Sequence, residues 1–138
     1  MNLEKVFIAA VTQDGRLIQY IKDPSEAVQL AAVKENGYAI KYIKNPSEEL
    51  QIAAVSQEGY SIEFIDKPTE QVQLAAVNQY AFSIRFIENP SEAVQLAAVK
   101  QNSEAINNIY KPSDKVKLAA KIKTKTLLLL IMKYFFGI

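Results

Sequence analysis

Prolines recur along this chain at intervals of 22 residues. They stand at Pro24, Pro46, Pro68, Pro90 and Pro112. The decapeptide from Pro24 to Val33 returns with few changes after the next three prolines. A fixed period of this size predicts a stack of repeats in which each unit buries its apolar face only against its neighbours. We therefore expect one elongated repeat domain over residues 1–138 rather than a globule around a central core.

Composition narrows the functions that such a stack could perform. The 138 residues include 16 basic and 15 acidic side chains, so the net charge is +1. This balance disfavours a general nucleic-acid binder, because phosphate contacts need clustered Lys and Arg. The sequence has no Cys and no His, which excludes cysteine nucleophiles, thiolate metal sites and Ser-His-Asp triads. We predict a protein that is not an enzyme and assign it no catalytic, cofactor-binding or metal-binding residues.

The two ends of the sequence carry little targeting information. The N-terminus lacks a basic region followed by an apolar run, so we predict no secretory signal. The absence of Cys fits a reducing compartment, and a cytoplasmic location is therefore expected. The apolar run from Leu127 to Met132 is far shorter than the ~20 residues that cross a bilayer.

Each proline lies in a pattern that is typical of a helix start. In the second of these segments, we predict Asn45 as the N-cap, Pro46 at the first helical position and Glu48 reaching back to the cap. Lys67 and Lys111 occupy the predicted cap position in two other units. Those two helix starts are therefore expected to be weaker by about 1 kcal/mol each.

The remainder of each unit predicts a second, shorter element. An Ala-Ala pair, such as Ala53-Ala54, indicates close approach between neighbouring helices. Gly59, like Gly15 and Gly37 at the same unit position, predicts a left-handed residue that ends the first helix. The segment 60–65 combines helical spacing with residues that favour strands, and its strict alternation is broken. We favour a short helix over a strand.

The predicted architecture is an all-α solenoid of stacked helix-turn-helix hairpins with a 22-residue period. The units span about 2–23, 24–45, 46–67, 68–89 and 90–111, and residues 112–138 form a divergent C-terminal unit. Lysines and then leucines replace the expected glycine turn in this last unit, with Leu128 and Ile131 in register with the core isoleucines. We predict a longer closing helix whose apolar side covers the end of the stack.

The segments Ala31 to Ile40 and Val94 to Asn102 contain Ala-Ala-Val-Lys followed by a polar residue and Asn, with Gly37 after it in the first. They resemble the short α-helical repeats known as domain of unknown function 4116, which occur in proteins of bacteria, phages and large DNA viruses. The resemblance covers residues 3 to about 120. The family has no established activity, so the resemblance implies a helical repeat and assigns no site residue.

Aromatic residues recur at two positions of the unit and form the main candidate binding surface. One series is Tyr20, Tyr42, Phe64 and Phe86, and the other is Tyr38, Tyr60 and Phe82. Stacked units would align each series into a row that could bind a partner peptide, a partner helix or unstacked bases. Alternatively, the rings fill the seam between adjacent second helices, because recurring apolar positions usually form the core of a repeat. We select Tyr38, Tyr60, Phe82, Tyr42, Phe64 and Phe86 as the candidate partner-binding residues.

Polar rows also recur, and each has a structural explanation beside a functional one. We expect the row of Gln29, Gln51, Gln73 and Gln95 to face solvent. The acidic row that includes Glu48 is explained by helix capping rather than by metal binding or acid–base chemistry. Variable residues, among them Glu35, Gln57, Gln79 and Gln101, could read bases in a nucleic-acid binder.

The C-terminal segment joins lysines to an apolar run, which suggests either self-association or contact with an anionic membrane surface. We favour a homodimer through Leu127, Leu130, Ile131 and Tyr134 over membrane contact, because short anchors bind weakly. For the whole chain we predict a non-catalytic scaffold that binds a protein partner. The occurrence of the resembling repeats implies a possible phage or viral inhibitor or adaptor of a host or defence protein. The alternative is a helical repeat protein that binds single-stranded nucleic acid.

Overall fold

The computed structural model describes residues 2–137, and all of their regular structure is helical. Long α-helices alternate with short 3-10 helices, labelled η. In chain order they are α1 (Leu3–Gln13), η1 (Gly15–Tyr20), α2 (Glu26–Glu35), η2 (Gly37–Tyr42), α3 (Glu48–Gln57), η3 (Gly59–Phe64), α4 (Glu70–Gln79), η4 (Ala81–Phe86), α5 (Glu92–Gln101), η5 (Ser103–Asn108) and α6 (Asp114–Phe136).

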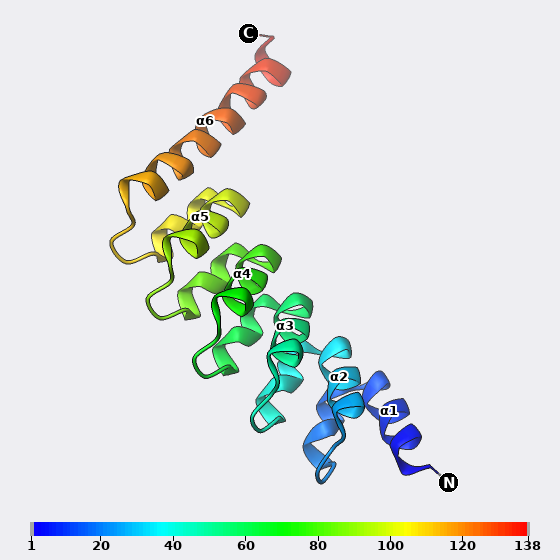
Figure 1. Ribbon diagram of the computed structural model, residues 1–138. Helices are drawn as coiled ribbons and strands as arrows, with labels where there is room; N and C mark the ends of the chain where they lie inside the picture. The colour runs from blue at the N-terminus through cyan, green and yellow to red at the C-terminus, as the bar shows by residue number, and fades with distance from the viewer. Residues whose placement is uncertain (1, 138) are drawn as a thin grey trace.

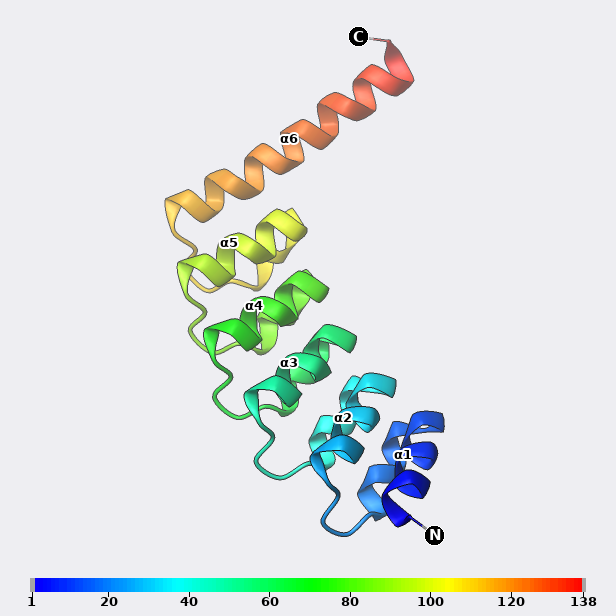
Figure 2. The same cartoon turned by 45° about the vertical axis from the view of Figure 1, so that its right-hand side comes forward.

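The hairpins stack side by side into an elongated solenoid. The α-helices lie next to one another in one layer, with the 3-10 helices behind them, and the two chain ends are at opposite ends of the body (Figures 1 and 2). Each 3-10 helix contacts its own α-helix, the following α-helix and the neighbouring 3-10 helices. The predicted all-α stack of hairpins is therefore confirmed, and its second element is a 3-10 helix.

The core is a set of apolar rows that run along the stack. One row is Val28, Leu50, Val72, Val94 and Val116, each at most 2 % exposed. A second row is Ile18, Ile40, Ile62 and Ile84 from the 3-10 helices, which is buried to the same degree. Val6 has the unit position of the valine row but is 44 % exposed, because it lies on the outer side of α1. Burial therefore comes from the neighbouring unit, as expected for a solenoid.

The helix starts differ from the prediction by two residues. The N-cap of α3 is Ser47, whose hydroxyl oxygen accepts a hydrogen bond from the Leu50 N–H at 3.3 Å. Asn45, the predicted cap, instead has a left-handed backbone with a φ of 50°. Pro46 consequently lies before the cap and not in the first turn. The Ser or Thr after each proline provides the cap because its short side chain reaches the free N–H groups.

The two starts that were expected to be weak are capped like the others. Thr69 and Ser113 cap α4 and α6, so the prediction for Lys67 and Lys111 at the cap position was wrong. These lysines adopt φ angles of 48° and 49°, in the region where Asn and Asp are tolerated better than Lys.

Replacing Lys67 with Asn should stabilise the protein by roughly 0.5 kcal/mol, because Asn adopts the left-handed backbone at lower cost. The reciprocal change, Asn45→Lys, should lose a similar amount. Urea denaturation followed by circular dichroism measures both variants. A gain in stability for both Lys67→Asn and Asn45→Lys would contradict this explanation.

The glycines are required by close contact between units and not by a left-handed backbone. Gly15, Gly37 and Gly59 do not have positive φ angles; among residues 2–137 only Gly137 is a glycine that does. A Cβ atom on Gly37 would lie 2.4 Å from the carbonyl oxygen of Ala54 in the next unit. The prediction that these glycines adopt the left-handed conformation was therefore wrong, although their unit position is a helix end.

Two buried hydroxyl groups weaken the middle of the stack. Ser61 and Ser83 are fully buried, and their oxygens have no hydrogen-bond partner. Ala39 and Ala105 occupy the same unit position and are equally buried. Burying a hydroxyl without a partner costs free energy that an alanine methyl group avoids.

Ser83→Ala should accordingly raise the free energy of unfolding by about 1 kcal/mol. The matched variant Ala105→Ser should lower it by a similar amount, since it introduces the same unsatisfied hydroxyl into an equivalent site. The midpoints of chemical denaturation test both changes. A destabilised Ser83→Ala protein would show that this hydroxyl finds a partner.

Helix α6 is about twice as long as the others and leaves the stack part-way along its length (Figure 2). Its first half lies on α5 and η5, where Val116 and Ala120 are buried. The leucines beyond it cover nothing, because residues Leu127 to Ile131 are 43–60 % exposed. The closing helix is present as predicted, but Leu128 and Ile131 do not take the place of core isoleucines. Within residues 2–137, no helix is long and apolar enough to cross a membrane.

Candidate interaction surfaces

The two aromatic series interleave into one stripe along η2, η3 and η4. The ring of Tyr38 meets that of Phe64 in the next unit edge to face, with centroids 6.1 Å apart and an interplanar angle of 80°. Tyr60 meets Phe86 in the same way, at 5.3 Å and 84°. Such contacts contribute about 0.5–1.5 kcal/mol each beyond area burial. The sequence-based alternatives are thus not exclusive, since the rings fill the seam and also form a row.

The stripe retains an open edge. Tyr42 and Phe64 are 36 % and 41 % exposed, whereas the rings of Tyr38, Tyr60, Phe82 and Phe86 are half-buried. Burial raises the pKa of the Tyr38 hydroxyl above its ordinary value. All six predicted partner-binding residues lie on η2, η3 and η4, and each of these three 3-10 helices contributes at least one half-buried ring.

One further aromatic residue belongs to this stripe and was missed by the sequence analysis. Tyr80 lies between α4 and η4, with its ring 4.9 Å from that of Tyr60 and 5.5 Å from that of Phe82. The equivalent residues Asn36 and Asn102 use their side chains to cap a 3-10 helix, and Tyr80 cannot do so. The signal available in the sequence was that Tyr80 places an aromatic ring at a unit position that is polar in these other units.

Basic side chains flank the stripe. The ammonium nitrogen of Lys41 lies 4.8 Å from the centre of the Tyr42 ring and 5.9 Å from that of Phe64. The guanidinium carbon of Arg85 lies 5.1 Å from the centre of the Phe86 ring. These are cation–π distances, so the exposed edge combines ring faces with positive charge.

The glutamine row of the α-helices does not face solvent freely, contrary to expectation. Gln29, Gln51, Gln73 and Gln95 are half-buried, and each amide nitrogen donates to the carbonyl oxygen of the proline five residues earlier at 2.8–2.9 Å. Each glutamine of the row therefore stabilises the turn that precedes its own helix.

A second polar row joins neighbouring units and is not free to read a ligand. The side-chain oxygen of Gln57 accepts a hydrogen bond from the Gly37 N–H at 2.6 Å, and its amide nitrogen donates to the Glu35 carbonyl oxygen at 3.3 Å. Equivalent bonds join Gly15 to Glu35, Gly59 to Gln79 and Ala81 to Gln101. From the sequence, these variable residues were candidate base readers. We call Glu35, Gln57, Gln79 and Gln101 the junction clamps.

The acidic row also connects units rather than closing a capping box. Glu48 is the first residue of α3, and its carboxylate accepts a hydrogen bond from the Thr69 hydroxyl of the following unit. Glu92 accepts from Ser113 at 2.7 Å, and this bond together with Lys115 lowers the pKa of the Glu92 carboxyl. The stability that the ionised Glu92 carboxylate contributes is fully present above the pKa that this group has in the unfolded chain. It is lost as the pH falls through the lower pKa of the same group in the folded protein.

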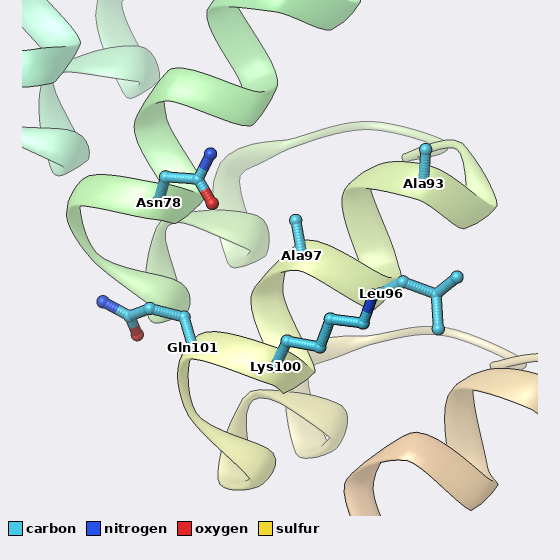
Figure 3. Close-up of a pocket in the computed structure, with 6 residues that line it drawn as sticks. All are labelled: Asn78, Ala93, Leu96, Ala97, Lys100 and Gln101. Carbon is cyan, nitrogen blue, oxygen red and sulfur yellow. The ribbon is translucent and has the colours of Figure 1, made fainter.

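The α-helical layer carries an aliphatic row that was not predicted as a surface. Leu30, Ile52, Leu74 and Leu96 are half-buried beside the small Ala residues that follow them. Between α4 and α5, Leu96, Ala93 and Ala97 line an open hollow of about 560 Å³, with Asn78, Lys100 and Gln101 at its edges (Figure 3). The hollow is mainly apolar and holds no pair of acid and base groups.

The four predicted self-association residues share one face of α6. Leu130 and Ile131 each lie three or four residues from both Leu127 and Tyr134, and Tyr134 is 87 % exposed. Phe135 and Phe136 are exposed at the tip of the same helix.

Within the described residues, no three acidic side chains lie close enough together to hold a metal ion.

Comparisons with protein-family models, curated proteins and solved structures found no match to this chain. The resemblance to the domain of unknown function 4116 repeats consequently stays a prediction.

Proposed function

We propose that the protein is a non-catalytic scaffold that binds a protein partner along the aromatic stripe. The observation that carries the proposal is the exposed edge formed by Tyr42 and Phe64 together with the neighbouring Lys41. Aromatic side chains that are anchored on one side and accessible on the other contribute most to protein interfaces. Their rigid attachment to successive units lowers the entropy cost of binding.

The partner that suits this surface is an extended or helical segment with apolar side chains and acidic residues. Apolar side chains would contact the rings, and carboxylates would pair with Lys41 and Arg85. By the resemblance described above, we extend this proposal to an inhibitor or adaptor that acts on a host or defence protein, in the cytoplasm.

Paired lysine variants on this edge provide the test. Tyr42→Lys combined with Phe64→Lys should weaken binding of a purified partner at least tenfold, about 1.4 kcal/mol, by removing ring contacts and adding positive charge. The control is Tyr110→Lys, an equally simple change at an exposed ring outside the stripe. Partners are first captured by the wild-type chain and then measured as purified pairs by calorimetry. Equal affinity of the stripe variant and wild type would refute the proposal.

Single-stranded nucleic acid is the second candidate, because Lys41 and Arg85 alternate with rings on which bases could stack. Glu63 interrupts this series of basic residues, which reduces the charge available for phosphates. Binding of an unstructured RNA oligonucleotide that weakens steeply with salt, and is lost in the stripe variant, would favour this second candidate.

A further inference from the structure

Unlike α1 to α5, α6 is followed by no 3-10 helix within residues 2–137, and a hollow lies beside the position of this missing element. In the inner units Ile18, Ile40, Ile62 and Ile84 are buried, with neighbouring 3-10 helices in contact. Ile106 in η5 is only half-buried, because no 3-10 helix follows η5 among the described residues. Beside it lies a hollow of about 630 Å³ between η5 and α6, with Ile106, Ala120 and Leu128 on its apolar wall and Lys117, Lys121 and Lys125 around it.

The described C-terminal segment, α6, does not fill this hollow. Lys125 stands at the unit position of Gly15, Gly37 and Gly59, where the other units leave the α-helix and turn back as a 3-10 helix. In the last unit the α-helix runs straight through that position to Phe136. The apolar residues that would have formed the missing element are carried away from the stack instead (Figure 2).

The projecting part of α6 continues the face that the first part already buries. Val116, Ala120, Leu127, Leu130 and Tyr134 are spaced by four, seven, three and four residues, which places them on one side of the helix. Val116 and Ala120 are covered by the stack, whereas the later three are exposed. The same face of α6 is therefore buried along the stack and exposed beyond its end.

We propose that a second copy of this chain supplies the missing cover, and that the two copies exchange the tips of α6. In this dimer the projecting segments of α6 contact each other through Leu127 and Leu130. The aromatic tip, Phe135 and Phe136, enters the partner's hollow beside Ile106. The arrangement gives the sequence-derived homodimer a specific geometry and is independent of the proposed function of the aromatic stripe.

Three features favour a second copy as the occupant. Each copy has both an empty hollow and a projecting apolar segment, so a two-fold axis satisfies both at once. The lysines around the hollow suit aromatic rings, and the chain already uses such pairs, as in Lys111 over Tyr110 at 5.1 Å. The two projecting segments are each about 15 Å long, so contact between them alone falls short of an interface of at least about 1,200 Å². Filling both hollows adds to the buried area.

Cysteine crosslinking tests the contact directly, because the chain has no cysteine of its own. Ile106→Cys and Phe135→Cys proteins, mixed and oxidised, should form a disulfide between the two different variants. Ser56→Cys, exposed on α3, mixed with Phe135→Cys is the control and should remain uncoupled. Failure of the first pair to crosslink more than the control would overturn the exchange, even if the protein is dimeric.

The oligomeric state is measured in parallel by sedimentation of the full chain. Phe135→Asp should raise the dissociation constant of the dimer at least tenfold, whereas Tyr110→Asp should leave it unchanged. Both side chains are exposed, so neither variant should unfold the stack. A wild-type monomer at all concentrations would overturn the proposal. So would a monomer that sediments with vesicles of phosphatidylcholine and phosphatidylserine, which would identify the segment as a membrane-surface contact.

Discussion

Ile62→Ala is expected to lower the free energy of unfolding by about 3–4 kcal/mol. Ile62 is 1 % exposed in the middle of the stack and belongs to the row of buried isoleucines in the 3-10 helices. Truncation leaves a cavity that the neighbouring units can close only by moving their own backbones. Because each repeat is stabilised by its neighbours, damage at the centre weakens two junctions at once.

Chemical denaturation, followed by circular dichroism, measures this loss. Two controls separate burial from residue type. Ile122→Ala makes the same change at an exposed position of α6 and should have little effect. Leu50→Val converts a buried leucine into the residue that other units carry at that position, and should cost no more than about 1.5 kcal/mol. Equal losses for Ile62→Ala and Ile122→Ala would show that the stack is not held together by this row.

Gly37→Ala is expected to cost about 2–3 kcal/mol, although it adds a single methyl group. The new Cβ would lie 2.4 Å from the Ala54 carbonyl oxygen and 2.9 Å from the side-chain oxygen of Gln57. Relief requires the two units to separate, which also stretches the hydrogen bond from the Gly37 N–H to Gln57. The cost therefore arises at the junction between units and not within one helix.

The choice of replacement distinguishes this explanation from a left-handed backbone. If Gly37 needed a positive φ, Asn would be tolerated better than Ala. Because the constraint is contact, Gly37→Asn should be at least as destabilising as Gly37→Ala. The control is Ala81→Gly, since Ala81 already places a methyl group at the equivalent site. The hydrogen bond from the Ala81 N–H to Gln101 is 3.1 Å long, longer than the bond from the Gly37 N–H to Gln57. A tolerated Gly37→Asn variant in thermal denaturation would contradict the contact explanation.

The aromatic stripe shows how far the sequence could lead toward a site. The unit positions of Tyr38 and Phe64 are evident in the sequence, and so is the prediction that each series forms a row. The pairing between them was not evident, because it joins different positions of successive units. Tyr80 was missed for the same reason, since its importance depends on rings contributed by the segments around it.

By itself, the sequence determined that the protein is a stack of helical hairpins whose recurring apolar positions are buried. The same apolar pattern returns with every proline, and residues that recur in this way can be buried only by a neighbouring copy of the unit. Local signals were also sufficient to predict that each unit begins with a helix, although not which residue caps it.

Only the tertiary structure decided what the polar residues and glycines do. Gln57, Glu48 and Gly37 make their decisive contacts with residues about one unit away, so their roles depend on the spacing between stacked helices. The fate of the C-terminal leucines was decided in the same way. Whether they cover the stack or project from it depends on the direction in which α6 continues past Lys125, because a helix that does not turn carries its apolar residues beyond the last unit.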